Sequence, residues 1–412
     1  MVADWARGGG RRLRGLADGL ARPGGRPSPS DAGAGDGGTA IRRALARLAR
    51  PLGLRGWRAG AAVLAGAVVL LIVAGMGLGG RRGARLMPGG GGNLPEVIAF
   101  YQNGWSAIYK SSFPSVQQHY ATINTVLAFW YSVDGSGQLH SHQPNAGITQ
   151  WIESHQMKMG VLINNIAGSS GNNAGMLTDP TARAAAVKNI VALVQRKRYQ
   201  EVNIDFELLH PSARQGLVSF MQDLRAALPK TVVLSESVFP KVGVPSQLNG
   251  AYDYTALAKV VNYLVIMLYD NHSDGGPAGP VSPYAWVVDN LNWFLHTANI
   301  PAGQLVLAAG VYGYDWPVGS TTAQEMPLTE IQAKIKALGV TPKMDAASEN
   351  PYFYYTGSNG NRHVVWFQNQ QTVQQRLNLA QKLGLRGVAI WALGEETPAV
   401  WSVIEQTWGP KK

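Results

Sequence analysis

The run at residues 202–207, Val-Asn-Ile-Asp-Phe-Glu, constrains the fold of this chain more than any other segment. Apolar and polar residues alternate in it, which is the pattern of a β-strand, so Asn203, Asp205 and Glu207 are expected on one face. Same-face residues of a strand lie roughly 6.5 to 7 Å apart, so one carboxyl group can change the pKa of the next. The run therefore predicts acid/base chemistry.

The alternative interpretation of this run is a solvated edge strand, because Asp and Glu in strands usually face water. Two leucines and a helical pattern at 212–228 follow it directly. This order is typical of a central strand in a β/α unit, where a buried carboxyl group needs a functional reason.

Short apolar runs recur along the rest of the chain and alternate with helical patterns at 181–198, 212–228, 284–297 and 372–383. Strands are expected at 96–101, 125–131, 159–164, 201–207, 231–237, 263–269, 304–311 and 387–391. This alternation predicts an α/β fold, a TIM (β/α)8 barrel.

The gap between the seventh and eighth expected strands is too long for one helix. Within it, 329–338 has a helical pattern, and 352–356 and 363–367 have strand patterns around a turn at 357–361. We therefore expect a small α+β insertion at about 317–367 that forms one wall of a substrate cleft.

The basic residues are concentrated at the N-terminus. Twelve arginines and four aspartates lie in 1–58, and three arginines at 81–85 complete the net charge of +11. The remaining chain is formally neutral, so no nucleic-acid partner is expected. We interpret 1–58 as a disordered basic cytoplasmic tail, 80–93 as a flexible linker and 94–412 as the barrel domain.

Residues 59–79 contain no charged side chain and are long enough to cross about 30 Å of hydrocarbon as a helix. We expect a single transmembrane anchor there. The arginines before it place the N-terminus in the cytoplasm and the barrel outside the cell membrane. A cleaved signal peptide and a buried soluble helix are the alternatives.

The chain has no cysteine, which excludes disulfides, thiolate metal sites and a cysteine nucleophile. His140 and His142 lie close together, but two histidines without a third ligand do not predict a metal site. No metal and no cofactor are expected.

Active sites of such barrels lie at the carboxyl ends of the strands. There the sequence brings together aromatic, carboxylate and amide side chains, which suit a sugar because pyranose rings stack on aromatic faces and their hydroxyls need hydrogen bonds. Any one of these aromatic residues could instead belong to the core. The set is Tyr101, Gln102, Trp130, Asn164, Asn165, Asp205, Glu207, Glu236, Met267, Tyr269, Asp270, Tyr312, Tyr314, Asp315, Trp316 and Trp391.

Three motifs, Asn-Ile-Asp-Phe-Glu at 203–207, Met-Leu-Tyr-Asp at 267–270 and Trp391, resemble glycoside hydrolase family 18. Segments at 269–272, 276–283, 312–316 and 363–367 are similar to its bacterial spore-germination and cortex-lytic N-acetylglucosaminidase branch. The resemblance covers about 95–408. The family signature Asp-Gly-x-Asp-x-Asp-x-Glu keeps only its last two acids here, with Gln200 and Glu201 at its start.

This resemblance implies a retaining mechanism in which the substrate's own acetamide attacks the sugar. The implied catalytic residues are Glu207 as the acid and then the base, Asp205 as the group that orients the acetamide, and Tyr269 as its hydrogen-bond donor. The implied substrate-binding residues are Asn203, Asp270, Trp391, Tyr101, Trp130, Tyr312 and Trp316.

We therefore expect a membrane-anchored, extracytoplasmic, monomeric glycosidase of β-1,4-linked N-acetylglucosamine glycans, with peptidoglycan as its polysaccharide substrate. A chitinase or N-glycan endoglycosidase is the alternative within the enzyme class. A carbohydrate-binding barrel without turnover is the alternative outside it.

Overall fold

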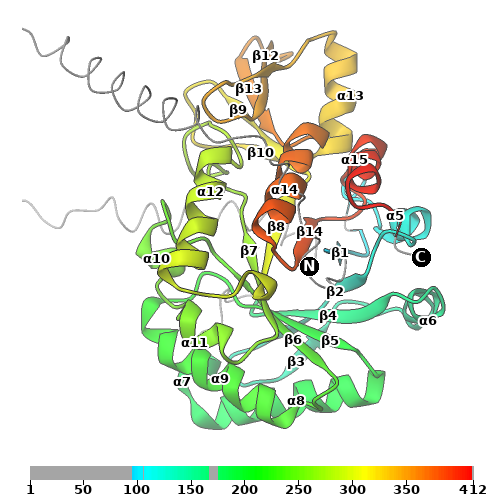
Figure 1. The fold of residues 1–412 in the computed structure, drawn as a ribbon. Helices are drawn as coiled ribbons and strands as arrows, with labels where there is room; N and C mark the ends of the chain where they lie inside the picture. The colour runs from blue at the N-terminus through cyan, green and yellow to red at the C-terminus, as the bar shows by residue number, and fades with distance from the viewer. Residues whose placement is uncertain (1–94, 105, 167–174, 411–412) are drawn as a thin grey trace, which may run out of the picture. The chain divides into compact units, whose positions relative to one another are not determined.

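The computed structural model describes residues 95–104, 106–166 and 175–410. In these residues eight parallel strands close into a barrel, which confirms the expected TIM-type core (Figure 1). The strands are β1 (Glu96–Tyr101), β2 (Thr125–Val133), β4 (Lys158–Asn164), β5 (Glu201–Asp205), β6 (Val233–Val238), β7 (Tyr263–Met267), β8 (Leu305–Gly310) and β14 (Gly387–Trp391). Pairing of β1 with both β14 and β2 closes the ring.

The barrel strands are apolar because both of their faces are buried. Ile98, Leu127, Val265 and Val306 pack against each other inside the barrel. The alternate residues of the same strands pack outward against the helices. Strand register therefore decides which residues face the barrel interior.

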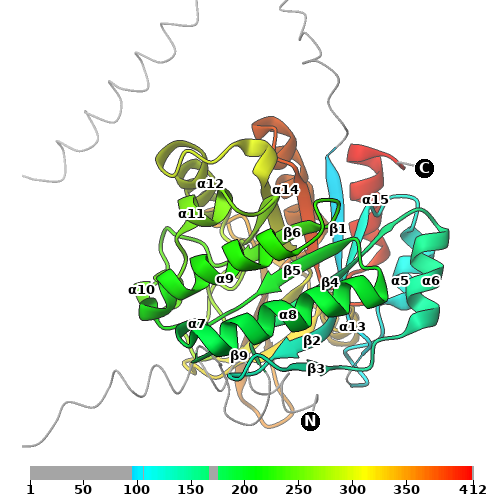
Figure 2. The ribbon, with the colours of Figure 1, turned by 90° about the horizontal axis from the view of Figure 1, so that it is seen from below.

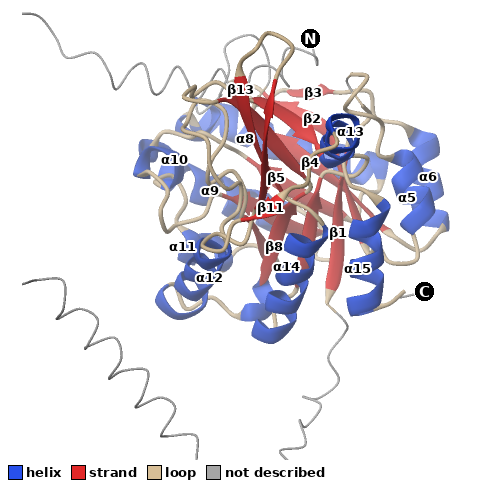
Figure 3. Cartoon of the chain, turned by 90° about the horizontal axis from the view of Figure 1, so that it is seen from above, coloured by secondary structure: helices blue, strands red, loops and turns tan. Residues whose placement is uncertain are grey.

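Helices surround the strands on the outside of the barrel (Figures 2 and 3). They are α5 (Phe113–His119), α6 (Ala146–Ser154), α7 (Gly175–Thr178), α8 (Pro180–Lys197), α9 (Arg214–Ala227), α10 (Ser246–Asn249), α11 (Tyr254–Ala258), α12 (Tyr284–Asn292), α14 (Gln370–Leu383) and α15 (Pro398–Trp408). Short turns η2 (Pro211–Ala213), η3 (Trp293–Thr297) and η4 (Ala302–Gln304) join them, and β3 (Leu139–Ser141) pairs antiparallel with β2.

Side chains at the helix ends explain where the long helices start and stop. Asp179 accepts a hydrogen bond from the Thr181 N–H at the start of α8. Asn369 and Thr372 form a reciprocal capping box at the start of α14. Gly384 ends α14 in the left-handed conformation, with φ of 65°, which glycine adopts without steric cost.

The α+β insertion lies between β8 and β14. It contains β9 (Tyr312–Pro317), β10 (Gln324–Pro327), α13 (Leu328–Leu338), β11 (Lys343–Met344), β12 (Pro351–Thr356) and β13 (Arg362–Phe367), in an antiparallel sheet of order β10-β9-β13-β12-β11. It begins at Tyr312, earlier than expected, because β9 follows β8 after a single residue. Tyr312 and Trp316 therefore belong to the inserted sheet.

The expected cytoplasmic tail at 1–58, the anchor at 59–79 and the linker at 80–93 lie outside the described residues. Among the helices that the structure describes, none has both the length and the apolar character needed to cross a membrane.

Candidate active site

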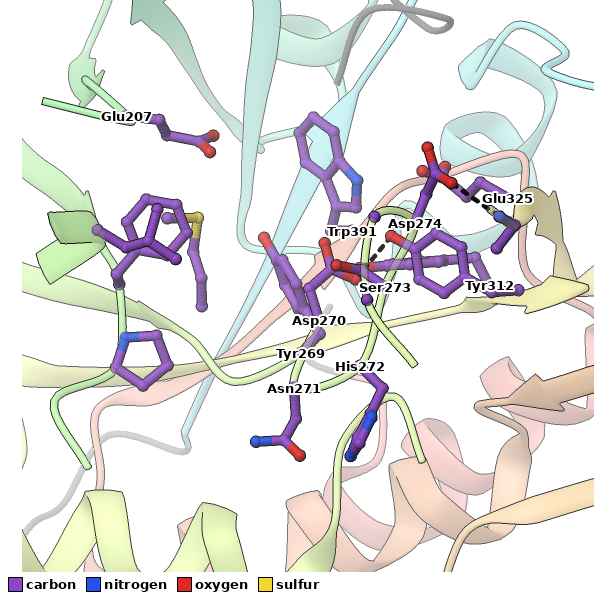
Figure 4. A pocket seen from close by; sticks show the side chains of 18 of the residues that line it. Glu207, Tyr269, Asp270, Asn271, His272, Ser273, Asp274, Tyr312, Glu325 and Trp391 are labelled. Atoms are coloured by element: carbon purple, nitrogen blue, oxygen red, sulfur yellow. Dashed lines mark hydrogen bonds between the residues drawn. The ribbon is translucent and has the colours of Figure 1, made fainter. Parts of the chain in front are cut away.

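A cavity of about 1210 Å³ opens at the carboxyl ends of the barrel strands. Barrel residues from β5, β7 and β14 line one part of it, and residues of β9 and β10 line the part beneath the insertion. Figure 4 shows the Glu207 carboxyl group facing Tyr269 and Trp391 across this space. The insertion thus contributes to the cavity wall, as its position in the sequence predicts.

Two neighbouring strands position Asp205 and Glu207. Asp205 is the last residue of β5 and points into the barrel. Strand β5 ends before Glu207, which the sequence pattern had placed within the strand. The Asn165 side chain holds Glu207 there: its Oδ1 accepts from the Glu207 N–H at 3.0 Å, and its Nδ2 donates to the Glu207 carbonyl at 2.9 Å.

Both carboxyl groups bind protons more tightly than isolated ones. Burial raises the pKa of Asp205 to about 7, although the Ser237 hydroxyl opposes this shift. Burial also raises the pKa of Glu207 well above its usual value, and the nearby charges of Asp205 and Asp270 add to the effect. Burial thus favours the protonated form of Glu207, which can donate a proton to a leaving group.

Tyr269 and Asp270 follow the end of β7. Asp270 is open to the solvent of the cavity, yet the surrounding protein raises its pKa to about 6. The Tyr312 and Tyr314 hydroxyls oppose that rise by donating to its Oδ1 at 2.6 and 2.9 Å. Burial and then the charge of Asp205 raise the pKa of Tyr269, so its phenol stays neutral and can act as a hydrogen-bond donor.

Trp391, the last residue of β14, forms an aromatic surface in the cavity. Its ring makes edge contacts with Phe100, at a centroid distance of 5.4 Å, and with Phe129, at 6.1 Å. The peptide bond between Trp391 and Ala392 is cis. A partly exposed aromatic face in the same cavity as Glu207 suits a sugar ring, whose C–H groups stack on it.

A second group of acids, Asp274, Glu325 and Glu395, lines the same cavity. Burial raises the pKa of Glu325 to about 7, and the charge of Asp270 contributes, while the Tyr109 hydroxyl donates to Glu325 at 3.2 Å. Among the described lining residues there is no Lys or Arg. The cavity is therefore unsuited to a strongly anionic ligand group.

Of the ten implied catalytic and substrate-binding residues, the structure brings six to the cavity and places four elsewhere. Asp205, Glu207, Tyr269, Asp270, Tyr312 and Trp391 line it, and Tyr101, Trp130, Asn203 and Trp316 do not.

Tyr101 and Trp130 lie on the outer face of their strands, where their rings make an edge contact at 5.7 Å. Side chains alternate along a strand, so Phe100 and Phe129 point inward in their place. The alternation of side chains, counted from the first residues of β1, is the sequence signal that could have identified Phe100 as a cavity residue.

Asn203 lies inside the barrel below the cavity, where its side chain contacts Ser235 and Ser237. Trp316 belongs to the apolar cluster of the insertion and donates to the Gly276 carbonyl. Neither residue reaches the cavity surface.

Two further acids of the predicted set also lie elsewhere. Glu236 points to the outer face of β6, fully buried, and neither of its carboxyl oxygens has a hydrogen-bond partner. Asp315 is bound within the insertion by Lys334, Tyr355 and His363. Sequence reasoning missed Ser237, Phe239, Trp286 and Glu325, which reach the cavity through tertiary contacts.

The two histidines near residue 140 each contact one nearby side chain. His140 lies 2.7 Å from Asp134, and His142 lies 3.0 Å from the Ser132 hydroxyl. In the part of the chain that the structure describes, no three His, Cys, Asp or Glu residues are grouped so that they could hold a metal ion.

Comparisons with known proteins agree with this geometry. The sequence profile described as glycosyl hydrolases family 18 matches residues 97–396. The chain is 26% identical over 314 residues to a Bacillus subtilis protein named uncharacterized glycosylase YvbX, covering 74% of this chain and 90% of that relative.

Two further similarities extend this result. The chain is 27% identical over 287 residues to the cortical fragment-lytic enzyme of Bacillus subtilis, covering 67% of this chain and 66% of that enzyme, slightly under two thirds of its length. A chitinase structure from Chromobacterium violaceum superposes with a TM-score of 0.70 at 27% identity, covering 76% of this chain and 98% of the chitinase.

The profile match spans most of the chain and contains Asp205 at the end of β5, Glu207 just after it, the Tyr269-Asp270 pair after β7 and Trp391 at the end of β14. This chain belongs to glycosyl hydrolases family 18 and is a glycoside hydrolase.

Proposed function

We propose that this chain hydrolyses β-1,4-linked N-acetylglucosamine glycans by a retaining mechanism in which the substrate's acetamide is the nucleophile. The observation that carries the proposal is the Glu207 carboxyl group, whose protonated form burial favours, in one cavity with Asp205 and facing Trp391. One acid that donates a proton and one that stabilises positive charge are the two groups that this mechanism needs.

In the first step the acetamide oxygen attacks the anomeric carbon while the glycosidic bond breaks. Glu207 transfers its proton to the leaving glycosidic oxygen. Asp205 accepts a hydrogen bond from the acetamide N–H and stabilises the positive charge that forms, and the Tyr269 hydroxyl donates to the acetamide. In the second step Glu207, now ionised, removes a proton from water, which attacks the anomeric carbon and restores the acetamide.

Peptidoglycan is the substrate that we favour. The similarity to a cortical fragment-lytic enzyme supports this choice. Chitin is the second candidate, because the chitinase structure is 27% identical and matches over nearly its full length. Both polymers contain β-1,4-linked N-acetylglucosamine, so the cavity chemistry described above is compatible with either.

We also propose that residues 59–79 anchor the chain in the cell membrane, with the N-terminus in the cytoplasm and the barrel outside. The uncharged sequence of this segment and the arginines that precede it support this orientation. Protease treatment of intact cells tests it: degradation of the barrel with protection of residues 1–58 is expected. Protection of the whole chain would refute the orientation.

Product analysis tests the activity. The full chain is incubated separately with purified sacculi and with chitin, beside Glu207→Gln and the exposed control Glu153→Gln on α6. We expect soluble muropeptides from sacculi with the wild type and the control, and none with Glu207→Gln. Oligomers from chitin alone would establish the second candidate. Binding to either polymer without products from any variant would contradict hydrolysis and favour a non-catalytic carbohydrate-binding barrel.

A further inference from the structure

The part of the cavity beneath the insertion carries acids for which the proposed mechanism gives no role. Glu325 on β10 lines this part, and Figure 4 shows it at the opposite end of the cavity from Glu207. Asp270 is close to both regions, because its charge acts on Glu207 and on Glu325. A ligand bound at Glu207 can therefore extend to this second group of acids.

Neutral groups and other acids surround Glu325. The Tyr109 hydroxyl donates to its Oε1 at 3.2 Å. Among the described lining residues there is no Lys or Arg. His272 is a lining residue that can carry a positive charge, and Figure 4 shows its ring pointing away from Glu325. The described lining of the cavity therefore places no cation beside Glu325.

Glu395 supplies an independent sign of a ligand. It lines the same cavity from the segment that follows β14, and it is 2% exposed. Gln102 Nε2 donates to its Oε1 at 3.0 Å. Its Oε2 is buried and has no hydrogen-bond partner among the described residues. Leaving a buried carboxyl oxygen without a donor is costly, so this oxygen is available to a donor that a ligand brings into the cavity.

The acids of this region act on one another. Burial raises the pKa of Glu325 to about 7, and the charges of Asp270 and Asp274 add to the rise. Burial also raises the pKa of Glu395, and the charges of Glu325 and Glu396 contribute. A cation near Glu325 and Glu395 would offset both causes, because it would stabilise the ionised carboxylates.

A primary ammonium group is the cation that this arrangement suits. In the ranges that the structure describes, no three His, Cys, Asp or Glu residues are grouped so that they could hold a metal ion. An ammonium group has three N–H donors and pairs with carboxylates without the ligand number and short distances that a metal requires. A sugar hydroxyl can also donate to a carboxylate, but it does not offset the negative charge.

We propose that Glu325 and Glu395 form a subsite for a primary ammonium group of the glycan, so that the enzyme recognises a glucosamine unit without its acetyl group near the cleaved bond. This inference rests on the proposed hydrolytic function. The cavity of about 1210 Å³ is larger than the about 300 to 1,000 Å³ of an ordinary ligand site, so it has room beyond the sugar at Glu207.

Two sources in a cell wall offer this chemistry. A de-N-acetylated glucosamine carries its ammonium group on the sugar ring, and therefore on the same strand that occupies the catalytic part of the cavity. The side-chain amine of a diamino acid in a stem peptide is the other source. We favour glucosamine because Asp270 connects the two parts of one continuous cavity.

The test is the position of glucosamine in the products of partly de-N-acetylated chitosan. The full chain is compared with Glu325→Gln, Glu395→Gln and the exposed control Glu153→Gln, and the units near the new ends are identified by mass spectrometry. With the wild type and the control, glucosamine should be enriched at one fixed position from the cleaved bond. In Glu325→Gln and Glu395→Gln this enrichment should fall about tenfold, because a hydrogen bond to a charged group is lost.

Equal enrichment in the wild type and both variants, or no enrichment in the wild type, would overturn the proposal. Enrichment is a ratio within one reaction, so a variant of low overall activity still gives a result. If Glu395→Gln does not fold, Glu325→Gln carries the test, because Glu325 is only partly buried and its replacement disturbs the packing less.

A second comparison identifies the source of the ammonium group. Sacculi that contain glucosamine are used intact, after removal of the stem peptides by an amidase, and after acetylation of all amines with acetic anhydride. If glucosamine is the source, acetylation should slow cleavage about tenfold and peptide removal should not. Slower cleavage after peptide removal would overturn glucosamine and assign the subsite to the peptide amine. Cleavage unaffected by acetylation would contradict any ammonium subsite.

Binding without turnover keeps this inference separate from the proposed function. Titration calorimetry on Glu207→Gln, alone and combined with Glu325→Gln, measures Kd for a glucosamine trimer and for its fully acetylated form. Adding Glu325→Gln should weaken binding of the glucosamine trimer about tenfold more than binding of the acetylated one. If the wild type cleaves no glycan, the proposed function fails and this comparison still tests the subsite. Equal weakening for both ligands would refute the subsite alone.

Discussion

Two groups of acids in this molecule differ in what surrounds them. In the insertion, Asp315 is 4% exposed and is contacted by Lys334 Nζ at 2.5 Å, by the Tyr355 hydroxyl at 2.5 Å and by His363 Nδ1 at 2.8 Å. In the cavity, six carboxyl groups lie together, and the described lining residues include no Lys or Arg. The hydrogen bonds described for them there come from hydroxyl and amide groups, such as those of Tyr312 to Asp270, Tyr109 to Glu325 and Gln102 to Glu395.

This difference shows how a structural acid can be told from a catalytic one. A cation beside a buried carboxylate keeps it ionised, so it contributes an ion pair to the fold. Without a cation, burial raises the pKa, and the acid can exchange a proton near neutral pH. The raised pKa values of Asp205, Glu207, Asp270 and Glu325 belong to this second kind.

The largest effect is expected from Glu207→Gln. Glutamine cannot donate the proton to the glycosidic oxygen, so kcat should fall by about 10²- to 10⁴-fold. The free energy of unfolding should not decrease, because a buried carboxyl group whose protonated form burial favours is replaced by a neutral group of the same shape. Chromogenic chitobioside hydrolysis and thermal unfolding measure the two quantities. If Glu207→Gln lost stability as well as activity, Glu207 would be a structural acid like Asp315.

Asp315→Asn should show the opposite pattern. Removing the anion leaves Lys334 and His363 without their partner, and breaking a buried pair costs about 3 kcal/mol. We place the loss at the lower end of the usual range because the Lys334 side chain is 25% exposed. Its kcat should stay near the wild-type value.

The control for this variant is Asp223→Asn, which breaks the surface pair with Arg183 and should change stability little. A loss of kcat in Asp315→Asn at a temperature where the protein stays folded would mean that a change in the packing of the insertion alters the active-site cavity.

The acid pair, the barrel and the insertion could be predicted from the sequence because each has a local signal. Strands buried on both faces give apolar runs, and Asp205 and Glu207 interrupt one of them with charge. The function of Asp315 could not be assigned in this way. It follows two tyrosines at a strand end, as a cleft residue would, and only the tertiary structure brings Lys334 beside it.

Strand register and short elements account for the other differences between the sequence prediction and the structure. Tyr101 and Phe100 are adjacent aromatics at one strand end, and which of them faces the cavity depends on pairing with neighbouring strands. Glu325 lies on β10, a strand of four residues, which is too short for its apolar and polar alternation to be detected in the sequence. Its place in the cavity depends on how the insertion packs over the barrel.

The pH dependence of stability should report the raised pKa of the cavity acid Asp205. The pKa of Asp205 is about 7 in the folded state and near 4 when unfolded, so the folded state binds more protons between these pH values. The free energy of unfolding therefore falls as pH rises through this window, by up to about 1.4 kcal/mol per pH unit for one such proton. Asp205→Asn should reduce this slope. Equal slopes in the wild type and Asp205→Asn would contradict the raised pKa.

The smallest effects are expected from a matched pair of tyrosine variants. Each variant removes one hydroxyl group that donates a hydrogen bond to a carboxylate. Tyr312 donates to Asp270 at 2.6 Å, and Tyr355 donates to Asp315 at 2.5 Å. In Tyr312→Phe the pKa of Asp270 should rise further above its usual value, because a hydrogen bond that opposes the rise is lost. We expect kcat/KM to fall a few-fold at neutral pH and to recover as the pH is raised.

Stability should change little in Tyr312→Phe, because Tyr314 still donates to Asp270. Tyr355→Phe should instead lower the free energy of unfolding by about 1 kcal/mol with kcat/KM unchanged, because Lys334 and His363 still contact Asp315. An equal loss of activity in both variants would contradict the idea that the cation beside Asp315 makes it a structural acid. The difference between the two groups of acids would then be better explained by where each group lies in the fold.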